Sequence, residues 1–173
     1  QPRHMAVLEG EEELHLAGAE ALAERLNDVP LYLRPRSFFQ THPEVAARLY
    51  ATARAWVDAL PVASLWDLYC GVGGFGLHCA SGRSLLGVEL AADAVASAQQ
   101  SAREMGLADA RFLCLDATAF ARQAAAAPDL VLVNPPRRGI GAELRARIEA
   151  LAPPFVLYSS CNPESLVQDA LRL

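Results

Sequence analysis

Short apolar runs alternate with helix-forming stretches from Pro61 to the end of this 173-residue chain. The runs have the length and composition of buried strands, and they cover residues 65–69, 85–89, 110–115, 129–133 and 155–159. The remaining stretches predict helices that end near residue 81, that cover 91–105, 118–126 and 142–151, and that begin at 163. Strands separated by helices form a parallel sheet with right-handed crossovers. The alternation therefore predicts an α/β fold with a mainly parallel sheet.

The first third of the chain follows a different pattern. Residues 5–8 and 13–16 flank a turn that contains glycine and predict a short hairpin, and residues 30–33 predict another strand. We therefore assign residues 1–36 to a small β appendage and residues 37–173 to the α/β domain.

A helix is predicted between the appendage and the first strand of the sheet. Thr41 suits an N-cap, Pro43 suits a first helical turn, and Glu44 would complete a capping box with Thr41. Apolar residues then recur at helical spacing as far as about Leu60.

Composition supports one folded domain. Apolar residues make up 53% of the chain and charged residues 20%, so a sizeable core can be buried. No apolar stretch approaches the roughly 18 residues that a membrane span needs. We expect a cytoplasmic monomer without a membrane partner.

The four cysteines, Cys70, Cys79, Cys114 and Cys161, show neither CxxC spacing nor the rhythm of metal ligands. The first three lie in apolar contexts, so we expect reduced, buried thiols that serve packing. The histidines are isolated, and His78 reads as a residue on the face of a short helix. We therefore predict no metal site.

A net charge of −5 weighs against this chain as a strong binder of nucleic acid by itself. Affinity for a phosphate backbone needs clustered lysines and arginines. Arginine pairs do occur, among them Arg137 and Arg138, and only their position can give them a role with RNA.

Three glycines between the first strand of the sheet and its helix form a G-x-G-x-x-G pattern: Gly71, Gly73 and Gly76. Such glycines let the backbone approach a ligand and leave a helix N-terminus pointing at it. Glu89, at the end of the next strand, is placed to accept hydrogen bonds from ribose hydroxyls. The pattern alone fits a nicotinamide dinucleotide, S-adenosylmethionine, or mere helix–strand packing. Asp67 favours S-adenosylmethionine, because a carboxylate suits the charged amino end of its methionine moiety and ill suits a pyrophosphate.

Asn134-Pro135-Pro136-Arg137 follows the strand at 129–133. The prolines fix the backbone, so the Asn134 side chain can be held rigidly over a ligand. Amino-group methyltransferases carry an aromatic residue after Asn-Pro-Pro, on which a flipped base stacks, and Arg137 cannot supply that platform. A guanidinium instead offers a cation for a phosphate or a developing enolate oxygen. A stiffened turn with solvated arginines is the alternative.

Cys161 lies just past the last predicted strand, among the polar residues Ser159, Ser160 and Asn162. A free cysteine is most often a small buried hydrophobe. A cysteine at the end of a strand can instead present its sulfur at a cleft, where its thiolate is a nucleophile. Because the glycine loop and Asn134 also follow strands, all three motifs are expected at one edge of the sheet, where such folds bind ligands.

Together these motifs resemble the RNA 5-methyluridine methyltransferase family. The resemblance runs from about Leu33 to the end of the chain and is carried by Phe39-Gln40, Asp67 to Phe75, Gly87 to Glu89, Asn134 to Arg137, and Ser159 to Pro163. The chain is most similar to the branch that acts on 23S ribosomal RNA. This similarity lies in residues 37–40, in the residues around Gly71, and in Asn134 in place of the family's more frequent aspartate.

The resemblance implies a Rossmann-like class I fold that depends on S-adenosylmethionine. It implies that Gln40, Tyr69, Glu89 and Asn134 contact this cofactor, with Asp116 as a lesser candidate for the adenine edge. Asp67, Gly71 and Gly73 are further candidates for the cofactor site.

It also implies that Cys161 is the nucleophile that adds to carbon 6 of a uracil, which makes carbon 5 able to accept a methyl group. Arg137 and Arg138 are candidates to steady the enolate or the RNA backbone. The substrate implied is a uridine of 23S ribosomal RNA.

Several family features are expected to be missing from this chain. They are the general base near the family's C-terminus, the last two strands of a seven-stranded sheet, and an N-terminal cysteine cluster for an iron–sulfur centre that the full-length protein would carry. Residues 1–36 would then be a remnant of a central RNA-binding region, and residues 37–173 an incomplete catalytic domain.

Other functions stay open on the sequence. They are uridine methylation in tRNA, a nicotinamide-dependent oxidoreductase supported only by the glycines and Glu89, and a non-catalytic RNA-associated module with a cofactor pocket. Adenine amino-methylation is disfavoured by Arg137.

Overall fold

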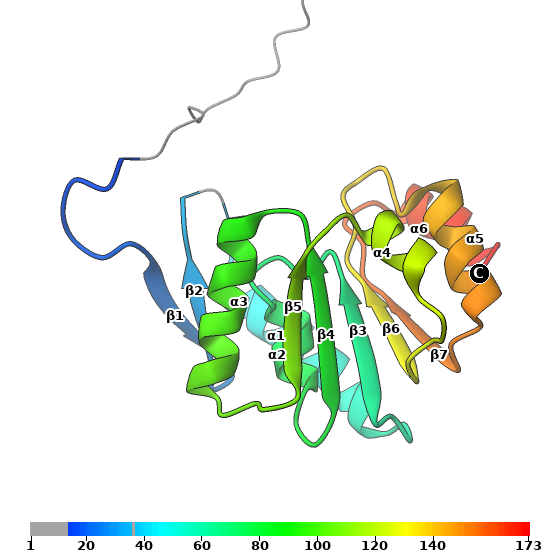
Figure 1. Cartoon of the computed structure of the whole chain (residues 1–173), viewed down its shortest axis with the longest axis horizontal. Helices are drawn as coiled ribbons and strands as arrows, with labels where there is room; N and C mark the ends of the chain where they lie inside the picture. The colour runs from blue at the N-terminus through cyan, green and yellow to red at the C-terminus, as the bar shows by residue number, and fades with distance from the viewer. Residues whose placement is uncertain (1–13, 36) are drawn as a thin grey trace, which may run out of the picture.

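The computed structural model describes residues 14–35 and 37–173. Figure 1 shows a central sheet with helices on both faces and a two-stranded hairpin beside it. The sheet has five strands in the order β5-β4-β3-β6-β7. Their bounds are β3 Ser64–Leu68, β4 Ser84–Glu89, β5 Ala110–Cys114, β6 Leu130–Val133 and β7 Phe155–Tyr158. All four pairings are parallel, which confirms the predicted sheet.

The register aligns the carboxyl ends of the strands. Leu68 pairs with both Val88 and Val133, and Val133 pairs in turn with Tyr158. The segments that follow these residues therefore leave the sheet at one edge. That edge is where the sequence motifs were expected to meet.

Helices cover both faces of the sheet. Around one core cluster lie α1 (Pro43–Asp58), α2 (Gly74–Cys79) and α3 (Ala92–Glu104), and on the opposite face lie α4 (Ala117–Gln123), α5 (Gly141–Leu151) and α6 (Pro163–Ala170). In Figure 1, α1 and α2 lie behind the strands and α4 in front. Successive strand residues point to opposite faces, so Leu130 and Leu132 join the first core, whereas Val131 and Val133 join the second.

The start of α1 differs from the prediction. His42, not Thr41, is the N-cap, and its Nδ1 accepts a hydrogen bond from the Val45 N–H at 3.4 Å. Pro43 occupies the first helical position, which makes the residue directly before it the cap. Thr41 lies one residue too early.

The N-terminal hairpin also differs from the prediction. β1 (Leu22–Leu26) and β2 (Val29–Leu33) pair antiparallel. Asn27 and Asp28 between them both have positive φ, 48° and 68°, as a two-residue type I′ turn requires. β2 was predicted and β1 was not. The hairpin predicted at residues 5–16 lies mostly outside the described residues, and its described end, residues 14–16, is not a strand.

The hairpin shares the core of the domain. Leu26, Val29 and Leu31 are buried in the same cluster as α1, α2 and α3. On the surface, Arg25 pairs with Glu104 of α3 at 2.9 Å, and the Tyr32 hydroxyl donates to the same carboxylate.

One prediction about the cysteines needs correction. Cys70 and Cys79 are buried as expected, but Cys114 is exposed, because it ends the outermost strand β5.

His78 lies on the short helix α2, as predicted, on its buried side. It is 2% exposed, and its ring nitrogens face the carbonyl oxygens of Gly74 and Leu26. Burial lowers the pKa of His78.

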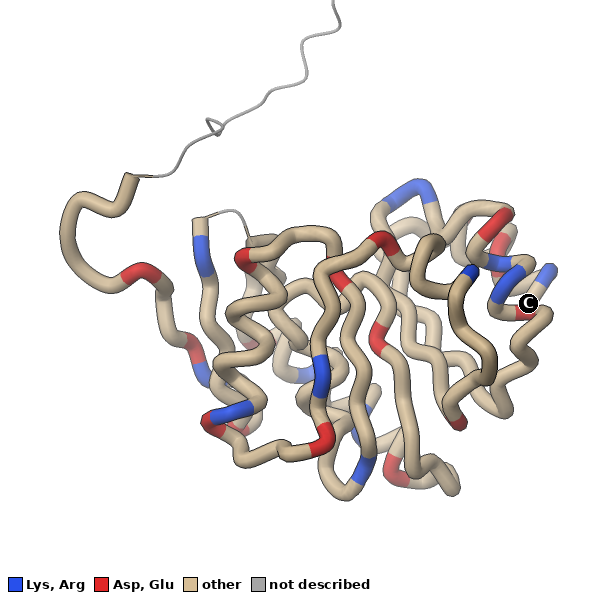
Figure 2. Tube along the Cα trace, viewed as in Figure 1, with Lys and Arg blue, Asp and Glu red and all other residues tan. Residues whose placement is uncertain are grey.

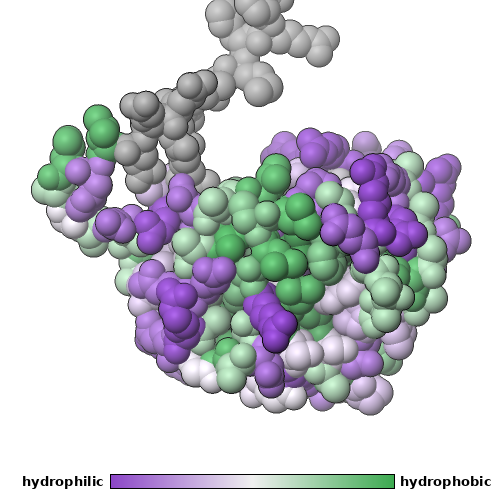
Figure 3. Space-filling view, viewed as in Figure 1, coloured by the Kyte–Doolittle hydropathy of each residue, from purple (hydrophilic) through white to green (hydrophobic). Residues whose placement is uncertain are grey.

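The face of the sheet that carries α4 is only partly covered. α4 has 7 residues and leaves Leu113 of β5 40% exposed. Figure 3 shows a hydrophobic area over the central strands of this face. Within the described residues, no helix is long and apolar enough to cross a membrane, and no cluster of three metal-ligating side chains occurs.

Candidate active site

A pocket of about 770 Å³ opens at the carboxyl edge of the sheet. Segments that follow β3, β4, β5, β6 and β7 form its walls, together with the residues before α1. The sequence-predicted residues that line it are Gln40, Tyr69, Gly71, Glu89, Asp116, Asn134, Arg137, Arg138 and Cys161. Five loops that are far apart in the sequence thus converge on one cavity, because parallel strands all end at the same edge.

Glu89 fixes one end of the pocket. Its Oε2 accepts a hydrogen bond from the Gly71 N–H at 3.1 Å, and its Oε1 accepts from the N–H groups of Leu90 and Ala91 at 2.8 and 2.9 Å. A carboxylate oxygen has two lone pairs, so Oε1 has both engaged, whereas Oε2 keeps one for a ligand. Glu89 therefore holds the glycine loop and the loop after β4 together and still offers one acceptor site, on Oε2, to the cavity.

Tyr69 turns the chain where β3 ends. Its φ is +67°, a left-handed conformation that is uncommon for a bulky residue. The N–H groups of Tyr69 and Cys70 both donate to the Val88 carbonyl, at 3.0 and 3.1 Å, which holds this turn in place. Burial raises the pKa of Tyr69, so its hydroxyl stays a hydrogen-bond donor at neutral pH.

Asp67 lies beneath the glycine loop and not among the lining residues. It is 1% exposed, and its Oδ2 accepts from the Gly76 N–H at 2.8 Å. Its Oδ1 is buried without a hydrogen-bond partner among the described residues. Burial, together with the charge of Glu89, raises the pKa of Asp67 to about 7 against the hydrogen bond from Gly76. Gly73 also does not line the cavity and serves as the N-cap of α2 with φ +87°.

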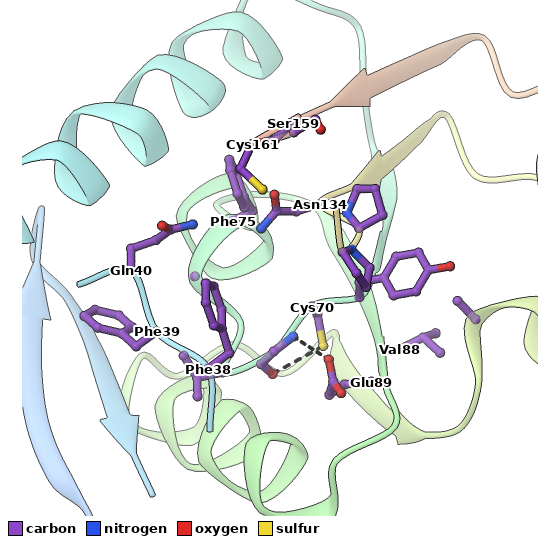
Figure 4. A pocket seen from close by; sticks show the side chains of 18 of the residues that line it. Phe38, Phe39, Gln40, Cys70, Phe75, Val88, Glu89, Asn134, Ser159 and Cys161 are labelled. Atoms are coloured by element: carbon purple, nitrogen blue, oxygen red, sulfur yellow. Dashed lines mark hydrogen bonds between the residues drawn. The ribbon is translucent and has the colours of Figure 1, made fainter. Parts of the chain in front are cut away.

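Cys161 and Asn134 form the other end of the pocket. Figure 4 shows the Cys161 sulfur directed toward the Asn134 side chain, with the Gln40 amide pointing toward the same space. The cysteine is exposed and lines the cavity. A thiol beside two side-chain amides can meet a planar ligand that presents polar edges.

Asp116 both caps α4 and lines the pocket. Its Oδ1 accepts from the Ala119 N–H at 2.9 Å and so caps α4. Its position in the pocket wall leaves the other oxygen for a ligand.

Arg137 and Arg138 stand exposed at the mouth of the pocket. Neither forms an ion pair with any residue that the structure describes. Figure 2 shows these basic positions on the loop between β6 and α5. Two unneutralised cations at the rim can attract an anionic substrate.

Asn162 was quoted in the sequence motif but given no role, and it ties two site loops together. Its Nδ2 donates to the Arg137 carbonyl at 2.9 Å, and its Oδ1 accepts from the Glu164 N–H at 3.1 Å as the N-cap of α6. The segment of Cys161 is thereby joined to the arginine loop. Its place directly before a proline is an N-cap signal that the sequence offered.

Several apolar residues of the pocket were missed by sequence reasoning. Phe38 is 72% exposed and Leu90 69% exposed, both unusual for large apolar side chains. Tyr50 of α1 packs edge-on against Phe75 with ring centroids 4.9 Å apart, and both rings line the cavity. The position of Leu90 directly after the acidic strand end was the available signal.

Comparison with known proteins gives a consistent result. Residues 27–173 match the family described as tRNA (Uracil-5-)-methyltransferase. The 23S rRNA (uracil(747)-C(5))-methyltransferases RlmC of Salmonella typhi and Salmonella typhimurium are 58% identical over 174 residues. These alignments cover 100% of the chain and 46% of each relative, so the chain spans about half the length of the curated relatives it matches.

Solved structures agree with the fold. The Pyrococcus abyssi tRNA (uracil-54, C5)-methyltransferase, in complex with S-adenosyl-L-homocysteine, superposes with a TM-score of 0.79 at 29% identity. The superposition covers 95% of the chain and 42% of that protein. A putative SAM-dependent methyltransferase from Streptococcus mutans shares the fold at a TM-score of 0.63 and 13% identity, over 92% of the chain and 47% of that protein.

Proposed function

Because the chain belongs to the tRNA (uracil-5-)-methyltransferase family, we propose that the protein methylates carbon 5 of a uridine in 23S ribosomal RNA, with S-adenosylmethionine as the methyl donor. The single observation that carries this proposal is that Cys161 and Glu89 line one cavity. The ribosomal substrate follows from the 58% identity to RlmC proteins, against 29% to the tRNA enzyme.

The residues present fit the cofactor. Its ribose hydroxyls donate hydrogen bonds, and Oε2 of the oriented Glu89 carboxylate keeps one acceptor site for them. Asp116 suits the adenine edge, and Gln40, Tyr69 and Asn134 line the same cavity. Figure 4 shows the side chains of Gln40 and Asn134 directed toward the space beside Cys161. When bound, S-adenosylmethionine supplies an electrophilic methyl group. A cavity of about 770 Å³ leaves room for a nucleobase beside it.

Cys161 would make the uracil reactive. Its thiolate adds to carbon 6, so a carbon–sulfur bond forms while the electrons of the 5,6 double bond move toward the carbonyl oxygen at carbon 4. Carbon 5 can then take the methyl group. Loss of the proton from carbon 5 to a base restores the double bond and expels the thiolate. Covalent catalysis thus divides one hard step into easier ones.

Arg137 and Arg138 would stabilise negative charge on the substrate. A guanidinium near the carbonyl oxygen stabilises the enolate that develops there, and a guanidinium at the rim pairs with RNA phosphate. The general base is not assigned to any described residue.

The test replaces the nucleophile. Cys161→Ala should abolish methylation of 23S ribosomal RNA and abolish the covalent adduct with RNA that contains 5-fluorouridine, because fluorine at carbon 5 prevents release of the enzyme. Mass spectrometry of the protein–RNA adduct is the measurement. Cys114→Ala is the matched control, since Cys114 is also exposed but lies outside the pocket, and it should react like wild type. Methylation by Cys161→Ala at the wild-type rate would overturn the mechanism.

Substrate choice is tested separately. Wild-type protein should methylate a 23S ribosomal RNA fragment faster than tRNA. A preference for tRNA would assign the protein to the other RNA class, and cofactor binding without any adduct would make it a non-catalytic module.

A further inference from the structure

A buried carboxylate on α6 connects three separate elements. Asp169 is 5% exposed. Its Oδ2 accepts from the Ile140 N–H at 3.0 Å and from the Tyr158 hydroxyl at 2.7 Å, and its Oδ1 lies 3.2 Å from the Arg145 guanidinium. One side chain thus joins α6 to the loop after β6, to the end of β7 and to α5.

The charges in this network are complementary. Burial alone would raise the pKa of Asp169, but hydrogen bonds from Tyr158, Ile140 and Arg145 outweigh it and lower that pKa. Burial, and the hydrogen bond to Asp169, raise the pKa of Tyr158, so its hydroxyl remains a donor.

Gly139 permits the close approach of the loop to α6. Its φ is +81°, and a Cβ at this position would lie 2.4 Å from Asp169 Oδ2. A side chain here therefore forces the loop away from α6. Gly141 has a similar φ of +78°, yet a Cβ there would meet nothing within 4 Å.

α6 is attached at both ends to the loop that carries the two arginines. Asn162 holds the Arg137 carbonyl at the start of the helix, and Asp169 holds the Ile140 N–H two turns later. Cys161 directly precedes Asn162, the N-cap of this helix. These two contacts therefore hold the segment of Cys161 against the loop that carries Arg137. At the other end of the pocket, Glu89 forms its hydrogen bonds with Gly71, Leu90 and Ala91, and not with Asn162 or Asp169.

We propose that Asp169 is a positioning residue that holds the arginine loop against the Cys161 segment, so that its loss slows thiolate addition to RNA without weakening cofactor binding. This inference rests on the proposed function. A carboxylate that only stabilised the fold would lower the melting temperature and leave the rate of addition per folded molecule unchanged.

The first test removes the charge of Asp169 and compares it with a second hydrogen-bonded carboxylate, Asp129. Asp169→Asn keeps the shape but replaces an acceptor oxygen by a donor. It should lower the rate of adduct formation with 5-fluorouridine RNA about tenfold or more, because small misplacements of reacting groups are costly. Its dissociation constant for S-adenosylmethionine should stay within about twofold of wild type.

Asp129→Asn is the control. Asp129 also accepts backbone N–H groups, from Ala63 and Ser64 at 2.9 Å, but at the start of β6, the end of the sheet opposite the pocket. It should lower the melting temperature and leave the rate unchanged, with all rates measured below both transitions. Equal rates in Asp169→Asn and wild type, or equal losses in the two variants, would overturn the inference.

The second test uses the two glycines. Gly139→Ala and Gly141→Ala share the strain of a positive φ, but only the first displaces Asp169. We expect slower adduct formation in Gly139→Ala alone, and similar rates in the two would count against the inference. Wild-type protein that binds no cofactor and forms no adduct would overturn the proposed function and this inference with it. A wild-type adduct matched by Asp169→Asn would overturn the inference only.

Discussion

A buried carboxylate that lacks a full set of hydrogen-bond partners makes the stability of the fold depend on pH. Asp67 has its pKa raised from 3.8 to about 7, so between these values the folded state binds a proton that the unfolded state has released. Stability from this group is therefore greatest at low pH and falls as pH rises, by up to about 1.4 kcal/mol per unit. The sign is opposite to that of Asp169, whose pKa is lowered.

Asp67→Asn tests this. The amide resembles the protonated acid and does not titrate. Denaturant unfolding from pH 4 to pH 8 should show wild type losing stability relative to the variant over the window between 3.8 and about 7. A difference in unfolding free energy that is constant across this range would contradict the burial argument.

At the scale of single residues, the sequence predicted the site residues whose location depends only on their place at the end of a strand. Glu89 ends a strand, Asn134 and Cys161 follow strands, and the strand ends of a parallel sheet meet. The contact of Asn162 with the Arg137 carbonyl and the contacts of Asp169 were not predictable, because they depend on how α6 lies against a loop 25 to 29 residues earlier. The same holds for the exposure of Cys114, which requires the strand order.

At the scale of elements, periodicity predicted every strand of the sheet and missed β1. Its residues, Leu22–Leu26, include charged Glu24 and Arg25 and carry no strand signal of their own. The turn decides the pairing: Asn27-Asp28 has the positive φ angles that match a tight hairpin.

This turn gives a prediction about stability. Asp28 has φ of 68°, which glycine adopts without the steric cost of a Cβ, and its side chain makes no hydrogen bond to another described residue. Asp28→Gly should raise the free energy of unfolding by about 0.5 kcal/mol, and Asp28→Val should lower it by more. Thermal unfolding of both variants is the measurement, and destabilisation by glycine would contradict the assigned turn.

At the scale of the whole molecule, charge is unevenly used. The chain carries a net charge of −5, yet the rim of the pocket presents Arg137 and Arg138. The net charge of the sequence thus argued against RNA binding, whereas the fold brings two cations together at the rim of one pocket.

The salt dependence of RNA binding tests whether these two arginines contact phosphate. Arg137→Gln with Arg138→Gln should weaken RNA binding and reduce the slope of log affinity against log salt by roughly one per arginine. Binding of S-adenosylmethionine should not change. Arg111→Gln is the control, because Arg111 is also exposed but lies at the far end of the strands. A salt slope equal to wild type in the double variant would exclude phosphate contacts by this pair.

The carboxylate that bridges the glycine loop and the loop after β4 does so through hydrogen bonds from the backbone of the chain itself. The entropic cost of ordering this wall is therefore part of folding, and a nucleoside binds to a preorganised surface. Stopped-flow traces of association should show a single phase linear in concentration, and amide exchange at Gly71 and Ala91, whose N–H groups bond to this carboxylate, should be slow before any ligand is added.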